Sequence, residues 1–328
     1  MDMLLRSSLF FSRATIKSKL FNMKATYIIL FLFTSSAWSE IFDYTYPKKS
    51  EKVRGIWIGP LSSLVLPGAN QWYEGQLPEG AIFSGVALAG LGLNRYAQIK
   101  IDRQEPCYQD DKNDPYFYYQ CNQTPYRLKA LGNQMYMASG GLSAYYSFQM
   151  AMKQRKEKLG EYGFIKEEDT INDVVLAPFK LSFLTRWTSW VPLGLLALGM
   201  RTTHLRGDDM AIATGESYNA GVWEEGFFRG YLMPAITQSS GSPFLGNFSS
   251  NLIFAAGHLP NQKKGNLPFT EFLAGYYLGW VTQRNKWSIQ ESVFIHFWVD
   301  VIGIVSTYSE DREESRLTLY LPLLQTAF

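Results

Sequence analysis

Stretches of mostly apolar residues recur along this chain, separated by charged segments or by segments that contain Pro and Gly. A helix needs about 20 residues to cross a bilayer core, and because several stretches are shorter, tilted, interrupted or re-entrant helices are expected. The sequence therefore predicts an all-α protein, a polytopic transmembrane bundle of about 7–8 membrane segments. The stretches are residues 55–72, 80–94, 130–150, 186–200, 211–236, 244–259, 268–283 and 288–307.

Composition supports burial in a core or in lipid and argues against nucleic acid. Of 328 residues, 46% are hydrophobic and the net charge is only +2, so disorder is not expected. No run of basic residues interleaved with aromatics is present, which argues against a nucleic-acid groove. The expected partners are membrane lipid and a peptide or membrane-protein substrate.

The first 39 residues resemble an export signal. Lys24 is followed by an apolar run from residue 25 to residue 33 and by small residues ending in Ala37-Trp38-Ser39. We expect residues 1–39 to be a signal peptide, with an uncleaved signal anchor as the alternative. Met23 is a candidate start of translation, because the 22 residues before it are unusual for a signal.

Residues 40–170 are expected to form a membrane hairpin, a loop with two cysteines and a third helix. Cys107 and Cys121 share one polar loop, and a disulfide between them fits an exported loop, while two free thiols are the alternative. Basic residues 153–158 follow the third segment and predict a cytoplasmic end there, although basic residues 48–54 oppose that topology.

Two features of the apolar stretches predict close turns and close packing. Residues 66–75, with Leu-Pro-Gly, a Gln at position 71 and a Tyr at position 73, resemble the turn of small bacterial membrane hairpins, and an ordinary Pro-Gly interfacial turn explains them equally well. Small residues at 85–92 and the spacing of Gly275 and Gly279 would let helix backbones approach closely in lipid.

Charged residues interrupt one apolar helix in the last third of the chain. Glu225 and Arg229 are four residues apart and can pair on one helix face, which cancels charge inside a membrane. Glu224 points about 100° away and is left to act as a general acid or base on water. An interfacial ion cluster is the alternative interpretation.

Two of the three histidines also lie in apolar helices, where ionisable side chains are costly and usually mark function. Phe254 and His258 share a face, on which Phe254 would shield the histidine. His296 and Asp300 are also four apart, so the carboxylate could orient the imidazole or bind together with it. His204 lies among arginines in a loop and is interpreted as solvated.

Together these motifs resemble the CAAX-protease and bacteriocin-processing (CPBP) intramembrane peptidases, which include type II CAAX prenyl endopeptidases and lysostaphin resistance protein A. The resemblance covers about residues 185–307. It includes a glycine-bearing helix at 272–280 and leaves the first 170 residues uncovered. The three motifs read Glu224-Glu225-x-x-x-Arg229, Phe254-x-x-x-His258 and His296-x-x-x-Asp300.

The resemblance implies a catalytic membrane domain at residues 171–309, followed by a tail at 310–328. Glu224 and His258 would activate a water for attack on a peptide carbonyl, with His296 and Asp300 completing the site. Glu225, Arg229 and Phe254 would give structural support. Asp300 departs from the family's common Asn, and an ionised carboxylate cannot donate a hydrogen bond to an oxyanion.

A divalent metal is a second way to build the same site. Two histidines, His258 and His296, with Glu224 or Asp300 could supply three ligands for zinc and leave one position open. The predicted function is an intramembrane endopeptidase in a bacterial inner membrane, acting on a membrane-associated or lipid-modified peptide. A transporter or an assembly factor that uses the polar cluster as a proton relay is the alternative.

Overall fold

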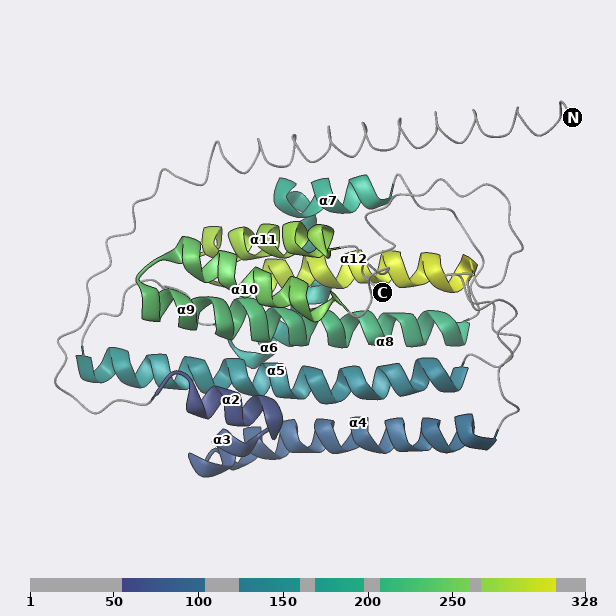
Figure 1. Cartoon of the computed structure of the whole chain (residues 1–328), viewed down its shortest axis with the longest axis horizontal. Helices are drawn as coiled ribbons and strands as arrows, with labels where there is room; N and C mark the ends of the chain where they lie inside the picture. The colour runs from purple at the N-terminus through teal and green to yellow at the C-terminus, as the bar shows by residue number, and fades with distance from the viewer. Residues whose placement is uncertain (1–54, 104–123, 160–168, 198–206, 260–266, 311–328) are drawn as a thin grey trace, which may run out of the picture. The chain divides into compact units, whose positions relative to one another are not determined.

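The computed structural model describes residues 55–103, 124–159, 169–197, 207–259 and 267–310, all within one compact unit (Figure 1). The described residues are helical, as predicted, and every predicted apolar stretch falls on one or more of these helices. The helices are α2 (Ile58–Val65), α3 (Ala69–Tyr73), α4 (Leu77–Arg103), α5 (Thr124–Leu159), α6 (Ile171–Leu176), two 3₁₀ turns (Ala177–Phe179 and Leu181–Thr185), α7 (Trp187–Ala197), α8 (Gly207–Glu224), a π-helical segment (Glu225–Leu232), α9 (Met233–Ser240), α10 (Pro243–Gly257), α11 (Phe269–Arg284) and α12 (Gln290–Glu310).

Several predictions concern residues outside the described ranges. They are the signal or anchor at 1–39, the cysteine pair Cys107 and Cys121, the loop histidine His204 and the tail beyond residue 310. Within the described ranges, no helix combines the length and the apolar character that a membrane crossing requires. The number of membrane segments therefore remains a prediction.

The turn after α2 is held by a buried glutamine. Gly68 has a φ of 90°, which favours glycine, and its backbone N–H donates to Ser143 Oγ on α5 (2.9 Å). The fully buried Gln71 side chain donates to the Ser143 carbonyl (3.0 Å) and accepts from Ser143 Oγ (2.7 Å). Hydrogen bonds at this turn therefore fix α2 and α3 against α5. The Pro-Gly pair predicts a turn here but does not predict these hydrogen bonds.

Helices α4 and α5 pack side by side through glycine (Figure 1). A Cβ on Gly90 would lie 2.6 Å from the Gly132 carbonyl, and one on Gly132 would lie 2.7 Å from the Asn94 nitrogen. The close approach predicted for residues 85–92 thus occurs at Gly90, whereas a Cβ on Gly85 or on Gly92 would meet no atom within 4 Å. Of the glycines within residues 85–92, only Gly90, on the buried side of α4, serves the packing.

Helix α8, the π-helical segment and α9 follow one another without a break, from Gly207 to Ser240 (Figure 1). The run ends at Gly241, whose φ of 71° is a common left-handed end of a helix. Ser242 then caps α10 by accepting the Leu245 N–H (3.3 Å), and Pro243 occupies the first helical position. This turn brings the second motif back against the first.

The start of α12 is fixed by one buried carboxylate. Asp169 accepts from Ser288 Oγ, from the Ile289 backbone N–H and from Gln290 Nε2, each at 2.7 Å. A carboxylate that accepts backbone N–H groups at a helix start also complements the positive end of the helix dipole. Asp169 therefore sets the position of the helix that carries His296 and Asp300.

Candidate active site

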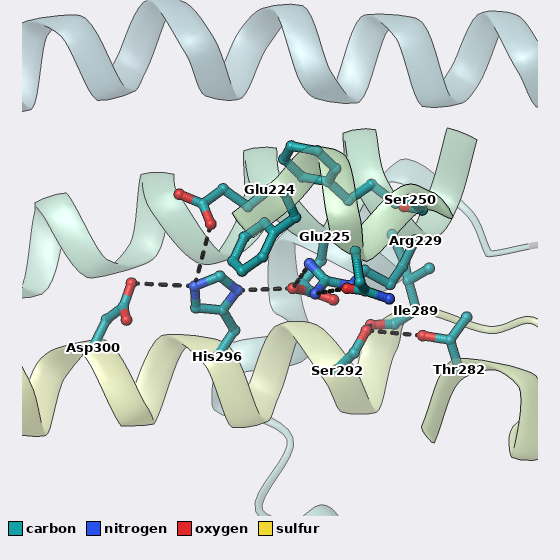
Figure 2. Close-up of polar contacts among 12 residues, drawn as sticks. Glu224, Glu225, Arg229, Ser250, Thr282, Ile289, Ser292, His296 and Asp300 are labelled. Carbon is teal, nitrogen blue, oxygen red and sulfur yellow. Dashed lines mark hydrogen bonds and ion pairs between the residues drawn. The ribbon is translucent and has the colours of Figure 1, made fainter. Parts of the chain in front are cut away.

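Three helical elements bring the predicted site residues together (Figure 2). Glu224 ends α8 and Glu225 begins the π-helical segment, which also carries Arg229. His296 and Asp300 lie on α12, which packs against both α8 and the π-helical segment. The result is one imidazole near three carboxylates, two from the neighbouring elements and one from its own helix.

The π-helical geometry of residues 225–232 is a feature that the sequence reasoning missed, because a regular α-helix was expected there. The Met233 N–H bonds to the Phe228 carbonyl five residues earlier, and the Ser250 hydroxyl of α10 donates to the same carbonyl (2.9 Å). A Cβ on Gly230 would lie 2.6 Å from the Tyr145 ring, so α5 packs directly against this wider turn. Short π-helical turns occur frequently at functional sites.

Glu225 and Arg229 form a fully buried ion pair. Glu225 Oε1 accepts from Arg229 Nη1 at 2.8 Å, and both side chains have no solvent exposure. The guanidinium also stacks over the Phe254 ring, with its central carbon 4.6 Å from the ring centroid. Because removing either charge would leave the other buried and uncompensated, this pair strongly constrains the local geometry.

The same glutamate oxygen holds His296. His296 Nδ1 lies 2.7 Å from Glu225 Oε1, the distance of a strong hydrogen bond in which the ring N–H donates to the carboxylate. Sequence reasoning assigned Glu225 to Arg229 alone and named Asp300 as the carboxylate that could orient the imidazole. The structure shows Glu225 in the orienting position and Asp300 on the other side of the ring.

The second nitrogen of His296 faces the other two carboxylates. Nε2 lies 3.6 Å from Glu224 Oε2 and 3.5 Å from Asp300 Oδ2, which is too long for a strong hydrogen bond (Figure 2). Glu224 Oε2 has no hydrogen-bond partner. One carboxylate oxygen beside this imidazole is therefore uncommitted.

His258 lies at the end of α10, as the C-cap residue. Its Nδ1 lies 2.9 Å from the Phe254 carbonyl, so a proton on Nδ1 leaves Nε2 as an acceptor. The Phe254 ring packs against His258, with ring centroids 4.6 Å apart, and lies edge-on to the His296 ring, with centroids 6.5 Å apart. Within the described part of the chain, His258 contacts the Phe254 backbone rather than the Glu224 carboxylate.

The segment of the chain that contains the three motifs matches a known family. Residues 209–302 match the model of the type II CAAX prenyl endopeptidase Rce1-like family. This segment contains all three motifs and confirms the resemblance that they indicated. It covers less than half of the chain. No curated protein and no solved structure matches the chain significantly.

The described residues of the Rce1-like segment do not form a metal-binding group. Across the described ranges, no three His, Cys, Asp or Glu side chains are arranged to hold a metal ion. Nδ1 of His258 and Nδ1 of His296 are each bonded to an oxygen of the protein. Because histidines that bind metal through Nε2 usually donate from Nδ1 in this way, the zinc set of His258, His296 and Glu224 stays a prediction, and no step of the proposed reaction is assigned to a metal.

Two further residues of the Rce1-like segment belong to the site. Ser292, one turn before His296, donates its hydroxyl to the Ile289 carbonyl (2.8 Å) and accepts from Thr282 Oγ1 (3.2 Å; Figure 2). Asn251 accepts from Arg229 Nη2 at 3.0 Å. A polar residue four positions before a motif residue, on the same helix face, is the sequence signal that could have identified Ser292.

Proposed function

We propose that the Rce1-like segment is the catalytic core of an intramembrane endopeptidase that hydrolyses a membrane-associated or lipid-modified peptide or protein. The observation that carries this proposal is the His296 imidazole, held on one side by Glu225 and facing Glu224 and Asp300 on the other. A base with a free oxygen beside an oriented imidazole is an arrangement that suits hydrolysis.

Glu224 is the proposed general base. Its Oε2 is buried and has no hydrogen-bond partner, so this oxygen is free to accept a proton from a water that enters the site. The water oxygen forms a bond to the peptide carbonyl carbon, and the C–N bond then breaks as the proton passes from Glu224 to the leaving amine. In the tautomer that donates from Nδ1 to the Phe254 carbonyl, His258 offers Nε2 as a second acceptor for the same water.

His296 and Asp300 are the proposed groups for the oxyanion. Glu225 accepts a hydrogen bond from Nδ1–H of His296, so the imidazolium form of His296 has a second N–H, on Nε2, that would donate to a carbonyl oxygen entering between Glu224 and Asp300. Asp300 can add a donor only in its protonated form, because an ionised carboxylate only accepts. The proposed oxyanion site therefore depends first on the orientation of His296.

The proposed location is a bacterial inner membrane, and a peptide or an envelope protein is the proposed substrate class. The signal-like residues 1–39 and the hairpin turn at 66–75 support an exported membrane protein rather than a protein that processes prenylated tails. That choice of substrate is an analogy and adds nothing to the chemistry of the site.

The test is cleavage of a pooled library of membrane peptides by detergent-purified protein, with metal analysis of the same samples. Glu224→Gln should abolish cleavage. Glu157→Gln, which changes an exposed carboxylate of α5, should not. Cleavage that persists in folded Glu224→Gln protein would overturn the proposal. If no folded protein cleaves any peptide, the polar cluster is better explained as the proton relay of a transporter or assembly factor.

A further inference from the structure

Two asparagines of α10 form a buried ladder beside Arg229. Asn251 Nδ2 donates to the Asn247 carbonyl (2.7 Å) and to Asn247 Oδ1 (2.5 Å), and Asn247 Nδ2 donates to the Tyr276 carbonyl of α11 (3.2 Å). Both asparagines are almost fully buried, at 0% and 2% exposure. Buried amides of this kind are costly unless they are bonded, and these have partners on both sides.

The two glycines of α11 make room for this ladder. A Cβ on Gly275 would lie 2.4 Å from Asn251 Oδ1 and 2.7 Å from Arg229 Nη2. A Cβ on Gly279 would lie 2.0 Å from Asn247 Oδ1. The spacing of these glycines therefore accommodates polar side chains of the neighbouring elements, and not a close approach of two helix backbones as the sequence predicted.

The ladder binds the terminal nitrogen of the guanidinium that Glu225 does not bind. Arg229 Nη2 donates to Asn251 Oδ1 and Nη1 donates to Glu225 Oε1, while Nε has no partner. These two hydrogen bonds fix the plane and the position of the guanidinium over the Phe254 ring. Glu225 Oε1 is the same oxygen that bonds to His296 Nδ1.

We propose that Asn251 is a positioning residue for His296, acting through Arg229 and Glu225, and that Gly275 keeps the space this contact needs. The proposal rests on the proposed peptidase function. It goes beyond that function because it assigns a role to residues outside the three motifs. A general helix-packing role would instead make Asn251 matter for stability alone.

The test compares near-isosteric variants. Asn251→Leu removes the hydrogen bond from Arg229 and the two hydrogen bonds to Asn247, Asn251→Asp keeps an oxygen for Arg229, and Gly275→Ala inserts the clashing Cβ. Asn94→Leu removes another interhelical asparagine bond, between α4 and α5, and Gly85→Ala adds a Cβ in open space. These two serve as matched controls.

The first readout separates kcat from KM. Asn251→Leu and Gly275→Ala should lower kcat about 10- to 100-fold, as for residues that orient a reacting group, with KM changed by less than about threefold. Asn251→Asp should recover most of kcat, and the controls should keep wild-type values. Equal activity per folded molecule in Asn251→Leu and Asn94→Leu would overturn the proposal.

The second readout does not depend on cleavage. The chain has three histidines, so the imidazole N–H signals of histidine-labelled protein can be assigned with single His→Gln variants. The Nδ1–H signal of His296 should move or vanish in Asn251→Leu and in Gly275→Ala, and remain in both controls. If it is unchanged in folded Asn251→Leu, the positioning role is wrong. If it changes although wild type cleaves no peptide, the proposed function fails and the positioning role stands.

Discussion

The buried ion pair gives the sharpest prediction for stability. Glu225→Gln keeps the shape of the side chain and an oxygen for His296, but it removes the charge that compensates the fully buried Arg229. Breaking a buried pair from one side costs about 3–5 kcal/mol, because the remaining charge is left in a poorly solvating environment. We expect the free energy of unfolding to fall by that amount.

Two further variants test the reasoning behind this number. Lys180→Met breaks a partly exposed pair with Asp173, in which the two side chains are 33% and 38% exposed, and should cost about 1 kcal/mol or less. Combining Glu225→Gln with Arg229→Met removes both buried charges and should recover at least half of the loss, since replacing a whole buried pair is often nearly neutral. Activity should stay low in the double variant, because His296 still lacks its carboxylate.

The assay is equilibrium unfolding in mixed detergent micelles, followed by the fluorescence of the nine tryptophans. A loss in Glu225→Gln no larger than the loss in Lys180→Met would refute the argument from burial. So would a double variant that is less stable than Glu225→Gln alone, because the remaining guanidinium would then not be the source of the cost.

Three other predictions follow from single contacts. Asp300→Asn should keep at least a tenth of the wild-type kcat, because an amide supplies an N–H donor next to His296, whereas Asp300→Leu should not; steady-state kinetics decide this. Asp169→Asn should lower the free energy of unfolding by about 1–3 kcal/mol, because the carboxylate that accepts three hydrogen bonds at the start of α12 loses its charge. Chemical denaturation measures this loss of stability. Gln71→Leu should lower stability by about 1–3 kcal/mol but leave activity per folded molecule unchanged, as active-site titration would show.

Helical periodicity predicted much of this arrangement. The four-residue spacings place Glu225 beside Arg229, His258 beside Phe254 and His296 within reach of Asp300. Such pairs depend only on the geometry of one helix, so one sequence is enough to predict them.

Contacts between helices were harder to predict. The bond from His296 to Glu225 and the bond from Arg229 to Asn251 each join elements distant in the sequence. Which residues pair across two helices depends on the rotation of each helix about its axis, and the spacing of residues along one helix does not specify that rotation. The role of Gly275 was not predicted for the same reason, because its neighbours are side chains of two other elements rather than a helix backbone.

The π-helical segment has a consequence for any change in chain length near the site. A π-helical turn holds about one residue more than an α-helical turn, so residues 225–232 contain one residue in excess of a regular helix. Deleting one residue between Gly226 and Leu232 would let a regular helix form. Because the wider turn already absorbs the extra residue, its removal would leave α8 close to its present orientation relative to α9, whereas a one-residue deletion in a regular α-helix rotates the preceding residues by about 100°. Glu224 should therefore stay near α12 after such a deletion, and a one-residue deletion here should be better tolerated than one within the regular helix α9.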